Sequence, residues 1–352
     1  MLISQIETPA LVVDLDILES NHKKMLQILE PLNMALRPHY KSHKCTALAR
    51  LQVQNGAKGI CCAKLSEAED LILCGIEDVL IANQVTDPQK IARLAQLAAC
   101  CHLSVCVDSL ENIRQLDAAC TAWGSTLHCL VEYDVGMKRC GVSTEEEVLT
   151  LSKAIMEAEH LSFMGIQAYA GNLAHEYDHE KRQEESLLVE EKVGKLLAFL
   201  RMEGIWAPEV SGCSTGTVEM RPKPTVYTEA QAGSYLFMDA AYNRVGAGFG
   251  NSLFMLTSVI SASDDRVVCD AGVKSLGTDQ GNPVFELFPE AQVEMSEEHC
   301  AAYCAHACKV GDKLRLIPGH CCTTVNLHDW LYLIRGGKVV DRIPVTSRGK
   351  CR

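Results

Sequence analysis

The chain has 352 residues, a hydrophobic content of 47% and a formal net charge of −12 at pH 7. This acidic balance argues against a nucleic-acid partner, and the length predicts more than one ordinary domain. The first residues, MLISQIETPALVVDLD, lack a basic segment followed by an apolar one, and no apolar run reaches about 18 residues, so we expect no signal peptide, no membrane span and a cytoplasmic location.

Short β-rich segments alternate with amphipathic helical segments from about residue 10 to about residue 240. The expected strands are ALVVDL, MALRPH, KGICCA, DVLIA, LSVCVD, LHCLVEYD, FMGIQAYA and APEVSG. Between them, DPQKIARLAQLAAC and SLENIRQLDAAC are expected to be helices with Asp87 and Ser109 as N-caps. About eight β/α units indicate an α/β fold with a (β/α)8 TIM-type barrel, and a doubly wound sheet is the alternative.

The pattern changes after about residue 245, where strand-like segments such as SLFMLTSVISAS and WLYLIRGGKVVDRIPV are separated by turn residues. We therefore expect a barrel domain over residues 1–244 and a mainly β domain over residues 245–352. The first ~15 residues are candidates for pairing with the β domain. The segment GAGFG at 246–250 lacks the strand–loop–helix context of a phosphate loop, so we interpret it as a turn at the boundary.

The chain contains 18 cysteines, several of them as doublets in apolar segments. Without a secretory signal we expect most of them to be reduced and buried, where a thiol packs as a small hydrophobic group. Cys300, Cys304 and Cys308 recur every four residues, which predicts a shared helix face. Their spacing matches no zinc or iron–sulfur pattern, so packing is favoured over a metal cluster.

A basic segment, RPHYKSHK, follows the second expected strand. Barrel enzymes place their chemistry at the C-terminal ends of strands. In this segment Lys41 lies among Arg37, His39, His43 and Lys44, and like charge disfavours its ammonium form. A free amine there is available to form a Schiff base, and the alternative is an ordinary basic surface turn.

The segment SGCSTGT, which follows the last expected strand, has the composition of a phosphate-binding turn. Its glycines permit close approach of the backbone, and its hydroxyl groups come from Ser211, Ser214, Thr215 and Thr217. A lysine, a phosphate-binding turn and a barrel together suggest pyridoxal 5'-phosphate.

The segment IPGHCCTTVNLHD offers an imidazole and a thiol two residues apart, at His320 and Cys322. On an extended chain such residues face the same side. Imidazole and thiolate are suitable zinc ligands, and two protein ligands would leave positions open for substrate. The alternative is a buried cysteine beside a hydrogen-bonded histidine.

Seven motifs carry a resemblance that spans nearly the whole chain. They are, in order, TPALVVDLD, RPHYKSHK, DVGMKRCG, YAGNLAH, SGCSTGT, AGSYLFMD and PGHCCTTVNLHD. The set resembles the D-threonine aldolase/D-serine dehydratase family of fold-type III pyridoxal-phosphate enzymes, which have an alanine-racemase-like barrel and a metal site. The resemblance implies a homodimer with active sites near the subunit interface and a small D-amino acid as substrate.

The resemblance also implies roles for individual residues. Lys41 would hold the cofactor, Arg139 would lie near its phenolic oxygen, and Tyr169 would contact it. His175 matches the position of a proposed aldolase base. The residues expected at the phosphate are Thr215, Gly216, Thr217, Gly233 and Ser234. The divalent metal would be bound by His320 and Cys322.

The motifs favour different reactions within this family. SGCSTGT and the spacing of Tyr169 and His175 resemble the bacterial aldolases, whereas the H-x-C motif at 320–322 resembles the dehydratases. We expect aldol cleavage of a D-β-hydroxy-α-amino acid to glycine and an aldehyde. Dehydration of D-serine or D-3-hydroxyaspartate is the alternative, and a racemase or a pyridoxal-phosphate carrier is less favoured. A thiolate ligand favours zinc, with manganese and magnesium as alternatives.

Overall fold

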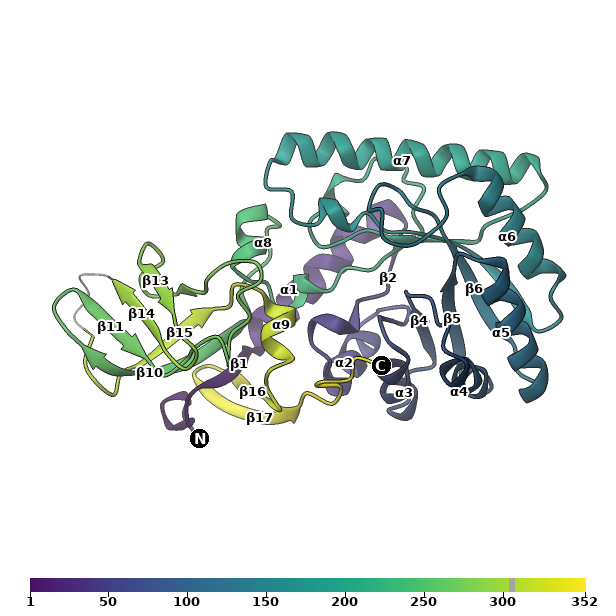
Figure 1. Ribbon diagram of the computed structural model, residues 1–352. Coiled ribbons are helices and arrows are strands. Elements are labelled where there is room, and N and C mark those ends of the chain that lie inside the picture. Colours follow the sequence, from purple (N-terminus) through teal and green to yellow (C-terminus); the bar gives the residue numbers. More distant parts are fainter. Residues whose placement is uncertain (304–307) are drawn as a thin grey trace. The chain divides into compact units, whose positions relative to one another are not determined.

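The computed structural model describes residues 1–303 and 308–352, which form two compact units (Figure 1). Unit 1 comprises Met1–Lys24, Lys41–Ala47 and Ser234–Gly349. Unit 2 comprises Met25–Tyr40, Leu48–Gly233 and Lys350–Arg352. A compact unit is defined by contacts and is not the same as a folding domain, so the domain boundary expected at 244/245 stays a prediction.

Unit 2 contains eight parallel strands in the order β2-β9-β8-β7-β6-β5-β4-β3. Their bounds are β2 Ala35–Leu36, β3 Ile60–Cys62, β4 Asp78–Ile81, β5 His102–Val107, β6 Leu127–Glu132, β7 Leu161–Ala168, β8 Glu209–Gly212 and β9 Glu229–Ala230. The Cys61 N–H donates to the Pro38 carbonyl oxygen at 3.0 Å, which joins β3 back to the segment after β2. The expected (β/α)8 TIM-type barrel is confirmed.

Helices cover the outer face of this barrel, as Figure 1 shows for α3 to α6 beside β4 to β6. The long helices are α1 Leu15–Leu29, α2 Thr46–Gln54, α3 Leu65–Leu73, α4 Pro88–Ala98, α5 Leu110–Trp123, α6 Glu145–Glu157 and α7 His179–Met202. Short 3-10 helices are η2 Glu30–Leu32, η3 Tyr40–Ser42, η4 Gly171–Leu173 and η5 Val218–Met220. Asp87 and Ser109 accept hydrogen bonds from backbone N–H groups at the starts of α4 and α5, so both predicted N-caps are confirmed.

Two features of the barrel differ from the expected strand order. The segment ALVVDL forms β1, Ala10–Asp14, but it pairs antiparallel with β10 and parallel with β16 in unit 1, so it is not a barrel strand. The eighth barrel strand is instead β9, which has two residues, of which one is the buried Glu229. Its polar composition hid it, because an apolar period is the signal by which a strand is recognised.

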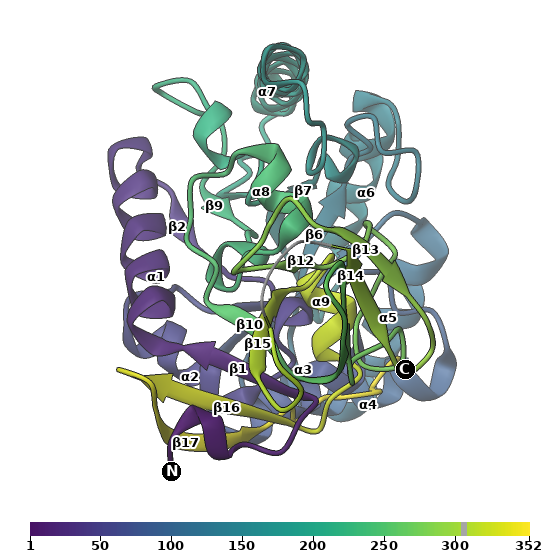
Figure 2. The same ribbon diagram turned by 90° about the vertical axis from the view of Figure 1, so that its left-hand side faces the viewer.

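Unit 1 contains a nine-stranded sheet in which β1 lies between β10 and β16 (Figure 2). Its other strands are β10 Leu253–Ala262, β11 Arg266–Cys269, β12 Val284–Phe285, β13 Gln292–Met295, β14 Cys300–Tyr303, β15 Lys313–Ile317, β16 Trp330–Arg335 and β17 Lys338–Pro344. The helices are η1 Ile3–Gln5, η6 Ser234–Leu236, α8 Ala240–Val245 and α9 Cys321–Val325. An apolar cluster fills one face of the sheet and contains Ile6, Ala10, Val12, Phe254, Leu256 and Ile334.

The cysteine-rich segment does not form the helix face that its spacing predicted. Cys300 begins β14 and lies opposite Cys269 of β11. Cys300 and Ala302 are buried and their neighbours are more exposed, so the alternation of a strand prevails over the four-residue repeat. Cys304 lies outside the described residues. Within residues 1–303 and 308–352, every cysteine is a free thiol, and no helix is long and apolar enough to cross a membrane.

Candidate active site

The two lysines of the basic segment differ in exposure. Lys41 lies in η3 with an exposed side chain, whereas Lys44 is only 9% exposed. Lys44 also has a left-handed backbone (φ +48°), and its carbonyl oxygen accepts from the Ser347 N–H at 2.9 Å. Exposure therefore favours Lys41 over Lys44 as the residue that meets a cofactor.

Arg37, which the sequence argument counted as like charge beside Lys41, is paired with carboxylates. Its guanidinium is buried in unit 2, where Nε contacts Glu229 Oε1 at 2.9 Å and Nη1 contacts Asp78 Oδ1 at 2.6 Å. Lys58 joins the same network through Glu209 and Glu229. The basic segment is therefore not one cluster of free positive charge, because Arg37 is neutralised by carboxylates that lie far from it in the sequence.

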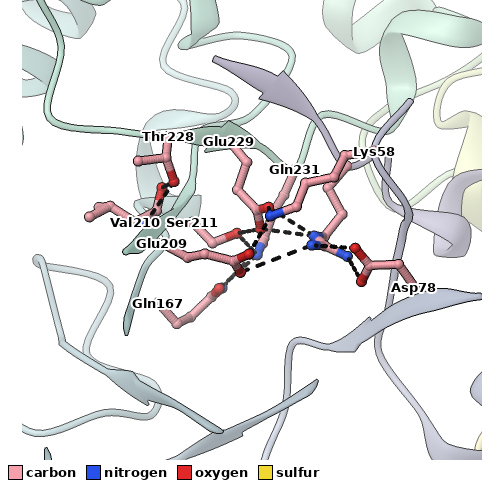
Figure 3. A network of polar contacts seen from close by, with 10 residues as sticks. Lys58, Asp78, Gln167, Glu209, Val210, Ser211, Thr228, Glu229 and Gln231 are labelled. Carbon is pink, nitrogen blue, oxygen red and sulfur yellow. Dashed lines mark hydrogen bonds and ion pairs between the residues drawn. The ribbon is translucent and has the colours of Figure 1, made fainter. Parts of the chain in front are cut away.

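The hydroxyl group of Ser211, which was expected in the phosphate turn, instead belongs to the same hydrogen-bond network. Ser211 Oγ donates to Glu229 Oε1 at 2.5 Å and accepts from Gln231 Nε2 at 2.8 Å (Figure 3). Ser211 lies within β8 and is completely buried, so its side chain belongs to the barrel interior.

The turn itself follows β8 and is closed by its own hydrogen bonds. The Ser214 N–H donates to Thr217 Oγ1 at 2.9 Å, and the Thr217 N–H donates to the Ser214 carbonyl oxygen at 3.1 Å. Thr215 and Thr217 are each at most 3% exposed, and Gly216 between them is buried. The result is a compact turn at the C-terminal end of a barrel strand, the position at which such folds bind phosphate.

His320 and Cys322 meet at the start of a short helix and not along a strand. His320 has extended backbone angles, but α9 begins at Cys321, so the expected extended run is wrong. The buried Asp239 accepts the Cys321 N–H at 2.8 Å, and the Thr324 hydroxyl donates to the His320 carbonyl oxygen at 2.8 Å. These contacts satisfy backbone groups at the first turn of α9 and hold both side chains at its start.

The two side chains share a hydrogen bond that favours their charged forms. The pKa of Cys322 is well below its usual value because Cys321 and His320 donate to the thiolate and Lys41 adds positive charge nearby. Burial alone would lower the pKa of His320, but Cys322 and Asp279 outweigh it and raise this pKa to about 9. The Ser234 Oγ lies 3.8 Å from the Cys322 sulfur. Unit 1 therefore assembles Lys41, Ser234, His320 and Cys322.

Two carboxylates support this group and were missed at the sequence level. Asp239 caps both α8 and α9, and Asp279 Oδ2 lies 2.7 Å from His320 Nδ1. Asp239 ends the AGSYLFMD motif but was given no role, and Asp279 lies in no quoted motif, because each acts across a long separation in sequence. In residues 1–303 and 308–352, no group of three or more His, Cys, Asp or Glu side chains is arranged to hold a metal, so His320 and Cys322 remain a two-residue donor set.

The remaining predicted residues lie in unit 2. Arg139 is half-exposed, with Nη2 3.9 Å from Glu132 Oε1 at the end of β6. Burial raises the pKa of Glu132, although Gln84 donates to its carboxylate at 2.6 Å. Tyr169 directly follows β7 and is partly buried.

Gly171 links the loop of Arg139 to Tyr169. A Cβ on this glycine would lie 2.8 Å from atoms of both Met137 and Tyr169, so a larger residue here would require these side chains to shift. His175 is partly buried and lies between η4 and α7. Gly233 ends the main segment of unit 2.

Comparisons with known proteins identify the family of this chain. Residues 13–241 match the family model described as alanine racemase, N-terminal domain, and residues 252–334 match a serine dehydratase domain. The chain is 42% identical to a 3-hydroxy-D-aspartate aldolase from Paracoccus denitrificans, over 99% of this chain and 93% of that protein. It is 39% identical to a D-threonine aldolase from Arthrobacter, over 99% and 95% of the two chains.

A solved structure is similar to this chain over nearly its whole length. The crystal structure of D-threonine aldolase from Filomicrobium marinum superimposes with a TM-score of 0.95 and 37% identity, over 99% of this chain and 98% of that one. A D-threo-3-hydroxyaspartate dehydratase from Delftia is more distant in sequence, with 29% identity over 91% of this chain and 92% of that protein.

Proposed function

Because the chain belongs to the D-threonine aldolase/D-serine dehydratase family of pyridoxal-phosphate enzymes, we propose that it cleaves D-β-hydroxy-α-amino acids to glycine and an aldehyde. Aldolases at 42% and 39% identity support this reaction over dehydration, since the dehydratase is 29% identical. The observation that carries cleavage over dehydration is this difference in identity, and the group formed by Lys41, His320 and Cys322 in unit 1 supports the cofactor and metal chemistry that both reactions share.

The residues present fit both implied groups. The exposed Lys41 amine suits attachment of the cofactor aldehyde, and the turn at 214–217 suits its phosphate. An imidazole and a thiolate in contact are a donor pair for zinc, which we propose over manganese or magnesium because thiolate is a soft ligand. When bound, pyridoxal phosphate withdraws electrons from Cα, and a divalent metal polarises the β-hydroxyl group of the substrate.

The residues of this chain would then divide the remaining work. Lys41 would hold the cofactor through its aldehyde, and Arg139 and Tyr169 would orient the ring. Thr215, Gly216, Thr217, Gly233 and Ser234 hold the phosphate. His175 would accept the proton of the β-hydroxyl group as the Cα–Cβ bond breaks and the aldehyde forms. Cα would keep the electron pair of that bond and take up one proton to give glycine, while the proton on His175 returns to solvent, so that no net proton is gained or lost.

Product analysis tests this proposal. D-threonine should give glycine and acetaldehyde, and D-3-hydroxyaspartate should give glycine and glyoxylate. His175→Ala should lower aldol cleavage by about 10²–10⁴-fold while the absorbance of the bound cofactor is unchanged. His179→Ala, an exposed histidine at the first position of α7, serves as the matched control and should keep full activity.

Dehydration is the second candidate, and the Cys322 thiolate is the observation that favours it. Under that reaction D-threonine would give 2-oxobutanoate and ammonia, and His175→Ala would have little effect. Dominance of these products would overturn the aldolase proposal and leave the fold and the family unchanged.

We further propose that the protein works as a homodimer in the cytoplasm. Support for the compartment comes from the free thiols of the described cysteines, which suit a reducing environment. Support for the dimer comes from the family to which the chain belongs. Light scattering coupled to size-exclusion chromatography should give a mass twice that of the 38.6 kDa chain.

A further inference from the structure

We infer that Asp279 is a positioning residue for His320, fixing the imidazole so that Nε2 faces the metal. This inference rests on the proposed function, which places a divalent metal at His320 and Cys322. Its basis is the 2.7 Å contact between His320 Nδ1 and Asp279 Oδ2. A carboxylate at Nδ1 holds the proton on that nitrogen and leaves the Nε2 lone pair for a metal.

The carboxylate of Asp279 is itself fixed at both oxygens. Asp279 Oδ1 accepts from the Thr323 hydroxyl at 2.6 Å, while Oδ2 is occupied by His320. The side chain of Asp279 is 46% exposed and that of His320 is 15% exposed, so burial alone does not hold the pair together. Two directed hydrogen bonds restrict the carboxylate to one orientation, which a surface ion pair lacks.

The loop that carries Asp279 is packed against α9 at glycine positions. A Cβ on Gly277 would overlap the Thr323 hydroxyl, and a Cβ on Gly319 would overlap the Gly281 carbonyl oxygen. The Gly277 N–H donates to the Thr324 hydroxyl at 2.9 Å. Glycine at these positions therefore lets residues 277–281 approach the start of α9 closely enough for Asp279 to reach the imidazole.

Among residues 1–303 and 308–352, no third His, Cys, Asp or Glu side chain joins His320 and Cys322 in a group that could hold a metal. Asp279 is engaged by Thr323 and His320, and Asp239 is engaged by the N–H groups of Cys321 and Tyr242. Both carboxylates therefore support the ligand residues and leave the open positions of the metal for substrate and water.

The test measures metal binding and needs no turnover. The full-length protein with its cofactor is freed of metal by a chelator, and Zn²⁺ is titrated in competition with a chromophoric chelator. Asp279→Ala should weaken Zn²⁺ binding by about 10–100-fold. Asp279→Asn should lose less, because its amide oxygen can still accept the Nδ1 proton. Asp341→Asn is the matched control and should bind as the wild type does, because Asp341 is an exposed carboxylate on β17 that accepts from the neighbouring Arg342 N–H.

A second readout separates positioning from simple support of the loop. Nitrogen NMR of the imidazole in the metal-free protein, recorded at a pH above the His320 pKa of about 9 and assigned with His320→Ala, should show the Nδ1–H form in the wild type and a mixture of both neutral forms in Asp279→Ala. Thr323→Val should leave this form unchanged. If Thr323→Val weakens binding as much as Asp279→Ala, or if Asp279→Ala binds Zn²⁺ within twofold of the wild type, the inference is wrong.

These outcomes are distinct from failure of the proposed reaction. An aldolase that is unaffected by Asp279→Ala in Zn²⁺ affinity would refute the positioning role alone. A protein whose Zn²⁺ affinity falls in both His320→Ala and Asp279→Ala, but which forms 2-oxobutanoate from D-threonine, would refute the aldolase proposal alone. A wild type with no His320-dependent Zn²⁺ binding would refute both the metal site and the positioning role.

Discussion

Replacement of Arg37 by methionine should destabilise the barrel more than loss of any exposed ion pair. Arg37 contacts Glu229 at 2.9 Å and Asp78 at 2.6 Å, and the side chain of Glu229 is 0% exposed. Removing one member of a buried pair typically costs about 3–5 kcal/mol, because the remaining charge is left buried. Glu229 keeps contacts with Lys58 at 3.1 Å and Ser211 at 2.5 Å, so we expect about 3 kcal/mol.

Urea denaturation followed by far-ultraviolet circular dichroism measures this loss of free energy of unfolding. Arg93→Met is the matched control, since Arg93 pairs with Glu69 at 2.8 Å with 46% and 29% of the two side chains exposed. The control should cost about 0–1 kcal/mol. The double variant Arg37→Met/Glu229→Met should be more stable than Arg37→Met alone, because no buried Glu229 charge remains. Equal losses in Arg37→Met and Arg93→Met would refute this account of the barrel interior.

Three further predictions follow from the described contacts. Burial alone would raise the pKa of Glu229, but Arg37 and Lys58 lower this pKa below its ordinary value near 4.5. The ionised Glu229 side chain therefore contributes to stability above that pH, and this contribution is lost as the pH falls through the lowered pKa. The stability gap between wild type and Glu229→Gln should therefore shrink in acid, and a gap that widens in acid would contradict the sign. Borohydride reduction and peptide mapping should place the cofactor on Lys41, and label on Lys44 would disprove the assignment. Chelation or Cys322→Ala should abolish turnover but leave the cofactor bound, whereas full activity of Cys322→Ala without added metal would eliminate the metal role.

The sequence predicted the parts of the fold that depend on local patterns. Seven of the expected apolar segments correspond to barrel strands β2 to β8, because buried parallel strands are short apolar runs between helices. The N-caps at Asp87 and Ser109 were recognised for the same reason, since each interacts with backbone groups within three residues. The ordered motifs identified the family before any contact was known.

Contacts between distant residues decided the rest. Strand β1 joins β10 and β16 because their apolar side chains complete one core, and β9 completes the barrel although Glu229 gives it no apolar pattern. Arg37 is four residues from Lys41 in the sequence, but its guanidinium is held in the barrel by ion pairs with Asp78 and Glu229.

At the candidate site, the sequence indicated Lys41, His320 and Cys322 through residue type and spacing, but their support came from the tertiary structure alone. Asp239 is far from Cys321 in the chain and Asp279 is far from His320, and neither forms a motif with its partner. A hydrogen bond depends on where atoms meet in space, whereas a sequence pattern records only which residues are neighbours along the chain. The sequence therefore predicted which chemical groups the candidate site offers. The orientation of the His320 imidazole depends on the packing of the loop at 277–281 against α9, which only the tertiary structure shows.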